Sequence, residues 1–246
     1  MDWKNSALPE TTLPTPDLHK GLFPPLSTGL QTLDDLIQGG IPRGKISEIN
    51  GDLSSGRTSL IFSIMKQATQ KEEVVAYVDA FDSLDPYLAR KAGIELSQLL
   101  WVRCRLNSKI GSVQLALKAA DILCQGGGIG VVVLDLSSVA SPAPYSIPSA
   151  QWFRLQRAIS GTKTTVIILS SGPSPSGASG LALSLSRVQS KWGSTSKTLE
   201  TSKDWTSNRK GRSARRQAVF QGIQSQLIIS RGNYHGRVTL YSYFQP

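Results

Sequence analysis

Hydrophobic positions along the chain follow two spacings in turn, one typical of strands and one typical of helices. Strand-like runs, alternating or continuously apolar, cover residues 45–50, 74–79, 99–104, 131–135 and 165–169. Helical spacing of apolar positions covers residues 30–37, 59–70, 86–92, 112–124 and 152–159. Strands and helices that alternate in this way build a parallel sheet covered by helices. We therefore predict an α/β fold with a doubly wound, mainly parallel sheet.

The regions outside this pattern divide the chain further. Residues 1–25 hold five of the 13 prolines and show neither spacing, which predicts a flexible arm, either extended or disordered. Residues 172–180 read GPSPSGASG and predict a flexible loop, while apolar alternation on both sides of Gly232–Gly236 predicts an antiparallel hairpin. The predicted parts are a flexible N-terminal arm at 1–25, a core at 26–190, a basic polar loop at 191–217, and strands at 218–246 that complete the core sheet.

A phosphate-binding loop is predicted between the first of these strands and the helix that follows it. Residues 51–58 read GDLSSGRT, against the template G-x-x-x-x-G-K-[ST], in which glycines let backbone N–H groups approach phosphate oxygens at a helix N-terminus. The candidate nucleotide-binding residues are Gly51, Ser54, Ser55, Gly56, Arg57, Thr58 and Ser59. An ordinary strand-to-helix turn is the alternative, since Thr58 and Ser59 also suit the first turn of any helix.

One position departs from the template. Arg57 stands where the template has a lysine that reaches the β- and γ-phosphates, and a planar guanidinium does not replace a compact ammonium. Thr58 supplies the expected magnesium hydroxyl, and Asp135, at the end of an apolar strand, is the candidate carboxylate that holds the metal through water. The alternative role of Asp135 is to cap the following turn. ATP and Mg²⁺ are the candidate cofactors. Because Arg57 replaces the lysine of the template, we do not expect ATP hydrolysis.

Composition narrows the class of protein. Apolar residues make up 39%, and no apolar run approaches the roughly 18 residues of a membrane-spanning helix. The N-terminal sequence MDWKNSALPETTLPTP lacks the basic head and apolar stretch of a secretory signal, so we expect a soluble, cytoplasmic protein. Cys104 and Cys124 show no C-x-x-C spacing and no histidine nearby, which predicts buried free thiols.

Positive charge is concentrated near the C-terminus. Residues 186–246 carry 11 basic and 2 acidic side chains, whereas residues 1–185 are nearly balanced, with 16 basic and 15 acidic. The candidate DNA-binding residues are Arg209, Lys210, Arg212, Arg215 and Arg216. This asymmetry favours an anionic partner, nucleic acid first. A solvated loop, or a patch that meets an acidic protein, is the alternative.

From Leu26 to about Leu169 the chain resembles the RecA family of ATPases. Residues 27–58 follow the pattern S-T-G-L-x-x-L-D-x-L-x-x-G-G-I-P-x-G-x-I-x-E-I-x-G-x-x-S-S-G-x-T, which is similar to the start of the RecA core. The strand LLWVRC and the helix leading into GGGIGVVVLDL more closely resemble ImuA, a RecA-like accessory family of bacterial error-prone lesion bypass. The resemblance implies a RecA-like P-loop core.

The same resemblance implies that the catalytic parts of the site are degenerate. In the RecA family a water-activating glutamate follows the strand aspartate by two residues, and Phe81 stands there in the run VDAF. A phenyl ring cannot accept a proton. Ser171 occupies the position of the glutamine that senses the γ-phosphate. The alternative is an active ATP-dependent, DNA-binding ATPase of RecA or KaiC type, with Asp82 as a substitute base.

The function implied by the resemblance is a non-catalytic interaction module of the DNA damage response, acting in translesion synthesis and induced mutagenesis. The implied partners are an ImuB-like polymerase-related protein, RecA, and DNA bound without sequence preference, as single strands. We expect a bacterial cytoplasmic protein that joins the nucleoid when DNA is damaged, with no membrane association. A regulator of cell division is a further alternative that no residue supports.

Overall fold

A computed structural model describes residues 2–4, 22–107, 109–137, 147–172, 179–194, 218–229 and 236–243, and nine strands in these residues form one sheet. The strands are β1 (Asp2–Lys4), β2 (Ile46–Gly51), β3 (Val75–Asp79), β4 (Leu99–Arg103), β5 (Val131–Asp135), β6 (Thr165–Ser170), β7 (Ser179–Ser194), β8 (Ala218–Ile229) and β9 (Gly236–Tyr243). The helices are α1 (Gln31–Leu36), α2 (Arg57–Thr69), α3 (Pro86–Lys91), the 3-10 turn η1 (Leu96–Gln98), α4 (Lys109–Gly126) and α5 (Ser149–Ile159).

The strand order is β1-β9-β8-β7-β2-β6-β5-β3-β4. The strands from β7 to β4 are all parallel to their neighbours, whereas β8, β9 and β1 continue the sheet in antiparallel fashion. The predicted fold class, a mainly parallel α/β sheet that ends in an antiparallel hairpin, is confirmed. The parallel strands place the loops after β2, β3, β5 and β6 at one edge of the sheet.

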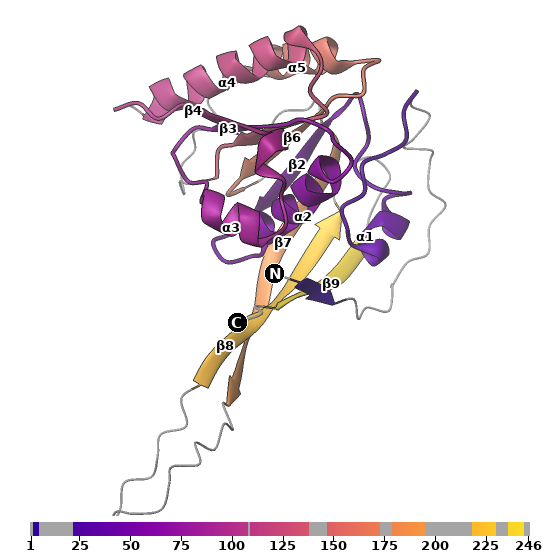
Figure 1. Cartoon of the computed structure of the whole chain (residues 1–246), viewed down its shortest axis with the longest axis vertical. Coiled ribbons are helices and arrows are strands. Elements are labelled where there is room, and N and C mark those ends of the chain that lie inside the picture. Colours follow the sequence, from indigo (N-terminus) through magenta and orange to yellow (C-terminus); the bar gives the residue numbers. More distant parts are fainter. Residues whose placement is uncertain are drawn as a thin grey trace, which may run out of the picture.

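Helices cover both faces of this sheet (Figure 1). α1, α2 and α3 lie on one face and bury Leu60, Ile64 and their neighbours against the sheet. α4 and α5 lie on the other face, where Trp152 is fully buried in a second apolar cluster. Because both faces are covered, β2, β3, β5 and β6 are buried along their whole length. The apolar runs of β5 and β6 predict this, whereas β2 alternates and buries Ser47, Glu48 and Asn50 as well.

The start and end of α3 lie at residues whose chemistry favours helix ends. The Asp85 carboxylate accepts hydrogen bonds from the backbone N–H groups of Tyr87 (2.8 Å) and Leu88 (3.1 Å), with Pro86 at the first helical position. Gly93 follows the helix with a φ of +89°, a left-handed conformation that glycine adopts without strain.

The C-terminal part of the sheet departs from the predicted boundaries. The loop expected at 172–180 ends in β7, since Ser179 and Gly180 are already in strand conformation. Residues 191–194 also belong to β7, so the prediction of a loop from 191 onward is wrong for these four residues. The physical reason differs along β7. Near its start β2 pairs with it and Leu181, Leu183 and Leu185 are buried against the helices, whereas residues 191–194 are held by backbone pairing with β8.

Part of the N-terminal arm pairs with the sheet. Asp2–Lys4 form β1, an antiparallel edge strand on β9, and residues 22–25 lead into the isolated bridge between Leu26 and Ile41. The rest of the arm, residues 5–21, lies outside the described residues.

Two further expectations concern the cysteines and the membrane. Cys104 and Cys124 are free and buried as predicted, and burial raises the pKa of the Cys124 thiol to about 12. Within the described ranges no helix is both long and apolar enough to cross a bilayer.

Candidate functional site: a RecA-type phosphate loop

The predicted phosphate loop joins β2 to α2. Gly51 ends β2 opposite Leu185 of β7, and a Cβ atom there would clash with the Leu185 carbonyl oxygen. Gly56 precedes α2 with a φ of +92°, in the left-handed region that other residues avoid. Both glycines are therefore required by the backbone, and the N-terminus of the 13-residue α2 opens onto the loop.

The Arg57 side chain turns into the protein. Only 7% of Arg57 is exposed, and its guanidinium donates to the carbonyl oxygens of Gly51, Ser170 (2.7 Å) and Ser137 (3.3 Å). These carbonyls lie at or just after the ends of β2, β6 and β5. Burial lowers the pKa of Arg57, and the nearby carboxylate of Asp135 opposes that shift. The guanidinium thus bridges three strand ends from within, at the position of the template lysine.

The candidate metal carboxylate is already occupied by protein donors. Asp135 is buried, and its Oδ2 accepts from the Tyr77 hydroxyl (2.6 Å) and from Ser83 Oγ (2.8 Å). Its Oδ1 accepts from the backbone N–H of Ser137 at 2.9 Å, as expected of the capping role. Burial, and then the charge of Asp135, raise the pKa of Tyr77 well above its usual value, so this hydroxyl keeps its proton.

The turn after β3 is organised by Asp79. Its carboxylate accepts from the backbone N–H groups of Phe81 (3.2 Å), Ser83 (2.9 Å) and Leu84 (2.9 Å). Trp101 Nε1 donates to the same carboxylate at 3.2 Å. The Phe81 side chain is half-buried and packs against the apolar cluster of α4 and α5. Phe81, which the RecA resemblance puts at the position of the water-activating base, thus packs against the core.

Asp82 does not replace this base. Its carboxylate forms a two-pronged ion pair with Arg103 of β4, at 2.7 Å to Nε and 2.6 Å to Nη2. The Arg103 guanidinium in turn lies over the Trp101 ring, 4.9 Å from its centroid. The hydrogen bond from Arg103 lowers the pKa of Asp82, which weakens it as a proton acceptor. The geometry thus argues against the alternative of an active ATPase that uses Asp82.

Ser171 links the loop after β6 to the loop after β5. Its hydroxyl donates to the Ser137 carbonyl at 2.9 Å, the same oxygen that Arg57 approaches. Ser170 Oγ donates to the carbonyl of Gly172 at 2.6 Å. These short side chains hold the loops after β5 and β6 together at the place where the RecA resemblance puts a phosphate-sensing glutamine.

The remaining loop residues fit a phosphate group better than they fit a metal. The Ser55 hydroxyl is 1% exposed and has no hydrogen-bond partner among the described residues, and Ser54 has a φ of +59°. Thr58 is exposed in the first turn of α2, whereas Ser59 is buried. Loop N–H groups, Ser55 and the α2 N-terminus would hold an anion there. In the described chain no cluster of metal-ligating side chains is found, and Asp135 has three donors already.

The sequence did not single out Tyr77, Ser83 and Asp79 as parts of this site. A signal was present at Tyr77, because a tyrosine inside a buried strand needs a partner for its hydroxyl. The pairing of β3 with β5 sets Tyr77 opposite Val133. Asp135 is two residues further along β5 and so lies on the same face of the sheet as Val133, within reach of the Tyr77 hydroxyl.

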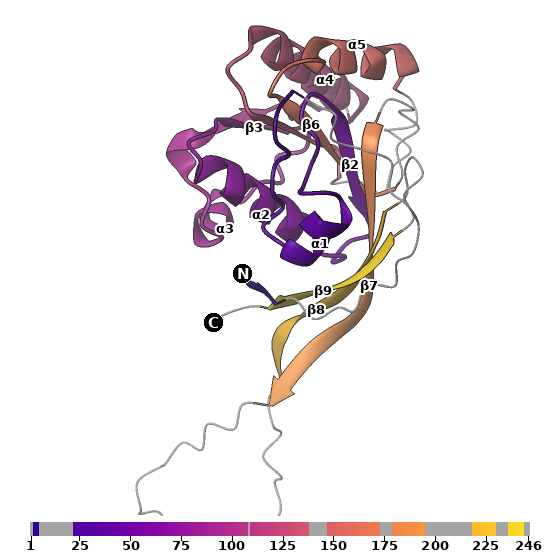
Figure 2. The same cartoon turned by 90° about the vertical axis from the view of Figure 1, so that its right-hand side faces the viewer.

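The candidate DNA-binding residues Arg209 to Arg216 lie outside the described residues. The ends of the segment that carries them are defined by the pairing of Ser194 with Ala218. Figures 1 and 2 show β7 and β8 leaving the body of the protein as a two-stranded ribbon. Residues 186–189 on this ribbon are exposed.

Comparison with known proteins agrees with this geometry. Residues 20–148 match the model of the RecA N-terminal domain. RecA of Methylococcus capsulatus is 42% identical over 120 residues, 48% of this chain and 32% of that protein. RecA of Thermus aquaticus is 36% identical over 129 residues, 52% of this chain and 35% of that protein. The aligned part thus spans about a third of these relatives' length. The chain belongs to the RecA N-terminal domain family.

Proposed function

We propose that this protein is a non-catalytic RecA-fold interaction module that links the DNA damage response to error-prone translesion synthesis. Membership of the RecA family supports a role in DNA repair or recombination. The narrower role rests on the resemblance of LLWVRC and GGGIGVVVLDL to ImuA. The proposed partners are an ImuB-like polymerase-related protein, RecA and single-stranded DNA, in the bacterial cytoplasm and at the nucleoid after damage.

The observation that carries the proposal is the internal bonding of Arg57. An ATPase needs its P-loop cation, its metal carboxylate and its base available to substrate. Here the cation bonds three backbone carbonyls, the carboxylate of Asp135 bonds three protein donors, and Phe81 fills the place of the base. These side chains stabilise the ends of the strands instead of contacting a substrate. This use of the site suits a protein that acts through binding surfaces and not through ATP hydrolysis.

Nucleotide binding and hydrolysis should separate in the variant Arg57→Lys. A lysine ammonium lacks the planar fork that bonds three carbonyls, so it is released toward the loop, where it can meet a phosphate. We expect tighter binding of a fluorescent ATP analogue than in the wild type, with hydrolysis still at background because Phe81 is unchanged. Robust turnover in this single variant would show that Phe81 is not the obstacle.

DNA binding is expected from the segment between β7 and β8. If all five cations from Arg209 to Arg216 meet phosphates, the slope of log K against log salt should be roughly −3.5 to −4.5. Replacing the five with serine should flatten this slope and weaken binding of single-stranded oligonucleotides of any sequence. Titration at two salt concentrations measures both quantities. An unchanged slope and affinity would remove the DNA role and leave a protein-contact segment.

The partner assignment is tested by affinity capture from damaged cells, with mass spectrometry of the captured proteins. Translesion polymerase components are the expected result, with RecA as a second partner. Capture of division proteins without polymerase components would overturn the proposed function.

A further inference from the structure

The outer surfaces of α4 and α5 carry large apolar side chains in solvent. Ile122 is 70% exposed and Ile110 is 64% exposed on α4, and Phe153 is 55% exposed on α5. Leu115 and Ile122 are seven residues apart and therefore share one side of α4, with Lys118 between them. Large exposed apolar side chains gathered on neighbouring helices are typical of an interaction surface.

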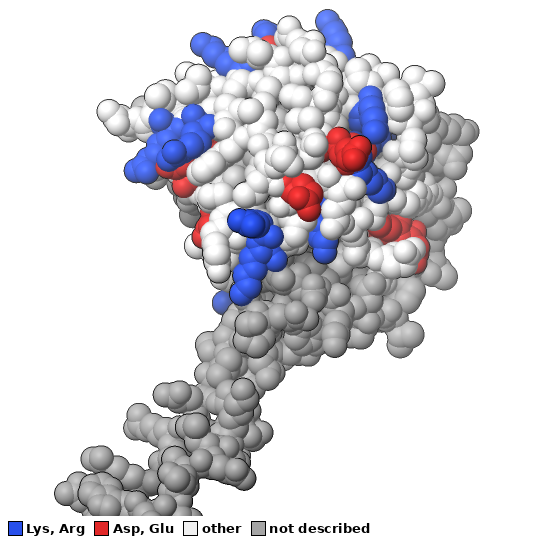
Figure 3. Space-filling view, viewed as in Figure 1, with Lys and Arg blue, Asp and Glu red and all other residues white. Residues whose placement is uncertain are grey.

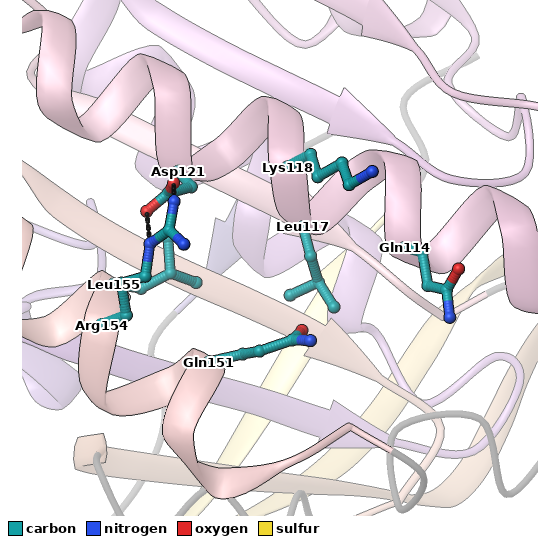
Figure 4. Close-up of a pocket in the computed structure, with 7 residues that line it drawn as sticks. All are labelled: Gln114, Leu117, Lys118, Asp121, Gln151, Arg154 and Leu155. Carbon is teal, nitrogen blue, oxygen red and sulfur yellow. Dashed lines mark hydrogen bonds and ion pairs between the residues drawn. The ribbon is translucent and has the colours of Figure 1, made fainter.

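A pocket of about 220 Å³ lies between these two helices (Figure 4). Its apolar lining comes from Leu117 of α4 and Leu155 of α5, which are themselves almost fully buried. Its polar lining comes from Gln114, Lys118 and Asp121 of α4 and from Gln151 and Arg154 of α5, and Asp121 is paired with Arg154, so Lys118 carries the unpaired positive charge of the lining. The pocket thus offers an apolar floor with polar and positive walls, a shape that accepts one apolar anchor side chain.

The charge on this surface is positive. Lys118, Arg154 and Arg157 are exposed, whereas the acidic residue Asp121 is largely buried and bonded to Arg154 through both of its carboxylate oxygens. Figure 3 shows Lys and Arg side chains projecting from the upper edge of the molecule, where α4 and α5 lie. Lys118 forms no ion pair with another described residue, so its ammonium is available to a partner.

We propose that the α4–α5 groove, defined by Gln114, Leu117, Lys118, Gln151, Arg154 and Leu155, docks an acidic amphipathic helix of a partner protein. An apolar side chain of that helix enters the pocket, a carboxylate one turn away meets Lys118, and a further apolar residue covers Ile122. This inference rests on the proposed function as an interaction module and names the surface that such a module uses.

The surface chemistry favours this occupant over two others. DNA would match the positive charge but would leave the pocket floor and Ile122 against a polar partner. A second copy would bring two positively charged surfaces together, which costs free energy through like-charge repulsion. An acidic amphipathic helix satisfies both the charges and the apolar groups.

The test is site-specific photo-crosslinking of the full-length protein in damaged cells. The substitution Gln114→p-benzoylphenylalanine puts the reactive group at the pocket rim, and Arg90→p-benzoylphenylalanine on α3 is the matched control position. We expect an adduct from position 114 on an acidic protein segment whose apolar residues recur every three or four positions, and none of this kind from position 90.

Two double variants decide whether the groove itself binds. Lys118→Glu with Ile122→Ser should lower the yield of the adduct roughly tenfold, because both the charge and an apolar contact are lost. Lys91→Glu with Leu88→Ser makes the same changes on exposed positions of α3 and should leave the yield unchanged. Overturning results are an adduct on nucleic acid, an adduct on a second copy, no adduct above the control, or a yield that the groove variant does not change.

A separate measurement tests the proposed function independently of the groove. If deletion of the whole protein leaves the damage-induced mutation frequency unchanged, the role in translesion synthesis is wrong whatever the groove binds. If deletion lowers that frequency but the crosslinks give an overturning result, only the groove assignment is wrong.

Discussion

Purified protein is expected to release phosphate from Mg·ATP at no more than the background rate, with or without single-stranded DNA. Positioned general bases typically contribute about 10²–10⁴-fold to such reactions, and Phe81 cannot act as one. Asp82 is held by Arg103 with a lowered pKa, and Asp135 is bonded to Tyr77, Ser83 and the Ser137 N–H group. Phe81, Asp82 and Asp135 are therefore not available to activate water.

The matched control is Thr58→Ala. Thr58 is exposed, so its replacement should leave the fold intact while removing the hydroxyl that a magnesium-dependent ATPase requires. Phosphate release should be the same in this variant and in the wild type. Turnover near one per second in the wild type that disappears in Thr58→Ala would contradict the account of the site.

Replacement of Arg57 by alanine is expected to lower the free energy of unfolding by about 3–5 kcal/mol, a large part of the stability of an ordinary domain. The variant leaves the carbonyls of Gly51, Ser137 and Ser170 without their shared donor. Because Arg57 is almost fully buried, water replaces these bonds poorly. Urea unfolding followed by circular dichroism measures the loss.

Arg90→Ala on the exposed side of α3 is the control for this experiment, with an expected change within about 0.5 kcal/mol. Residues that serve a ligand rather than the fold often cost stability, so their removal leaves the unliganded protein as stable or more stable. If Arg57→Ala proved as stable as Arg90→Ala, Arg57 would be a phosphate ligand and the strand ends would be held by other contacts.

The elements that could be predicted are those with a strong local signal. Asp85, Pro86 and Gly93 define the ends of α3 through backbone chemistry that depends on neighbouring residues only. Gly56 of the phosphate loop is similar, because its left-handed conformation depends on the local backbone, whereas Gly51 is required by the distant Leu185 carbonyl. The apolar run of β5 likewise predicts a strand covered on both faces.

The features that could not be predicted depend on distant contacts. β7 alternates Leu181, Leu183 and Leu185, yet its glycines and serines resemble a loop until β2 and β8 pair with it. Arg57 was visible as a departure from the template, but the direction of its long side chain depends on carbonyls 80 and 113 residues away. The exposed apolar side chains of α4 and α5 likewise became apparent only when the two helices were placed together.

The central claim is that the protein works as a RecA-fold module without ATP hydrolysis. The most direct measurement is the damage-induced mutation frequency of cells whose sole copy of the protein carries Thr58→Ala, at matched protein levels. The account predicts the wild-type frequency, well above that of the deletion strain, because the exposed Thr58 hydroxyl would be needed only for magnesium-dependent hydrolysis. A frequency that falls to the level of the deletion strain would contradict it.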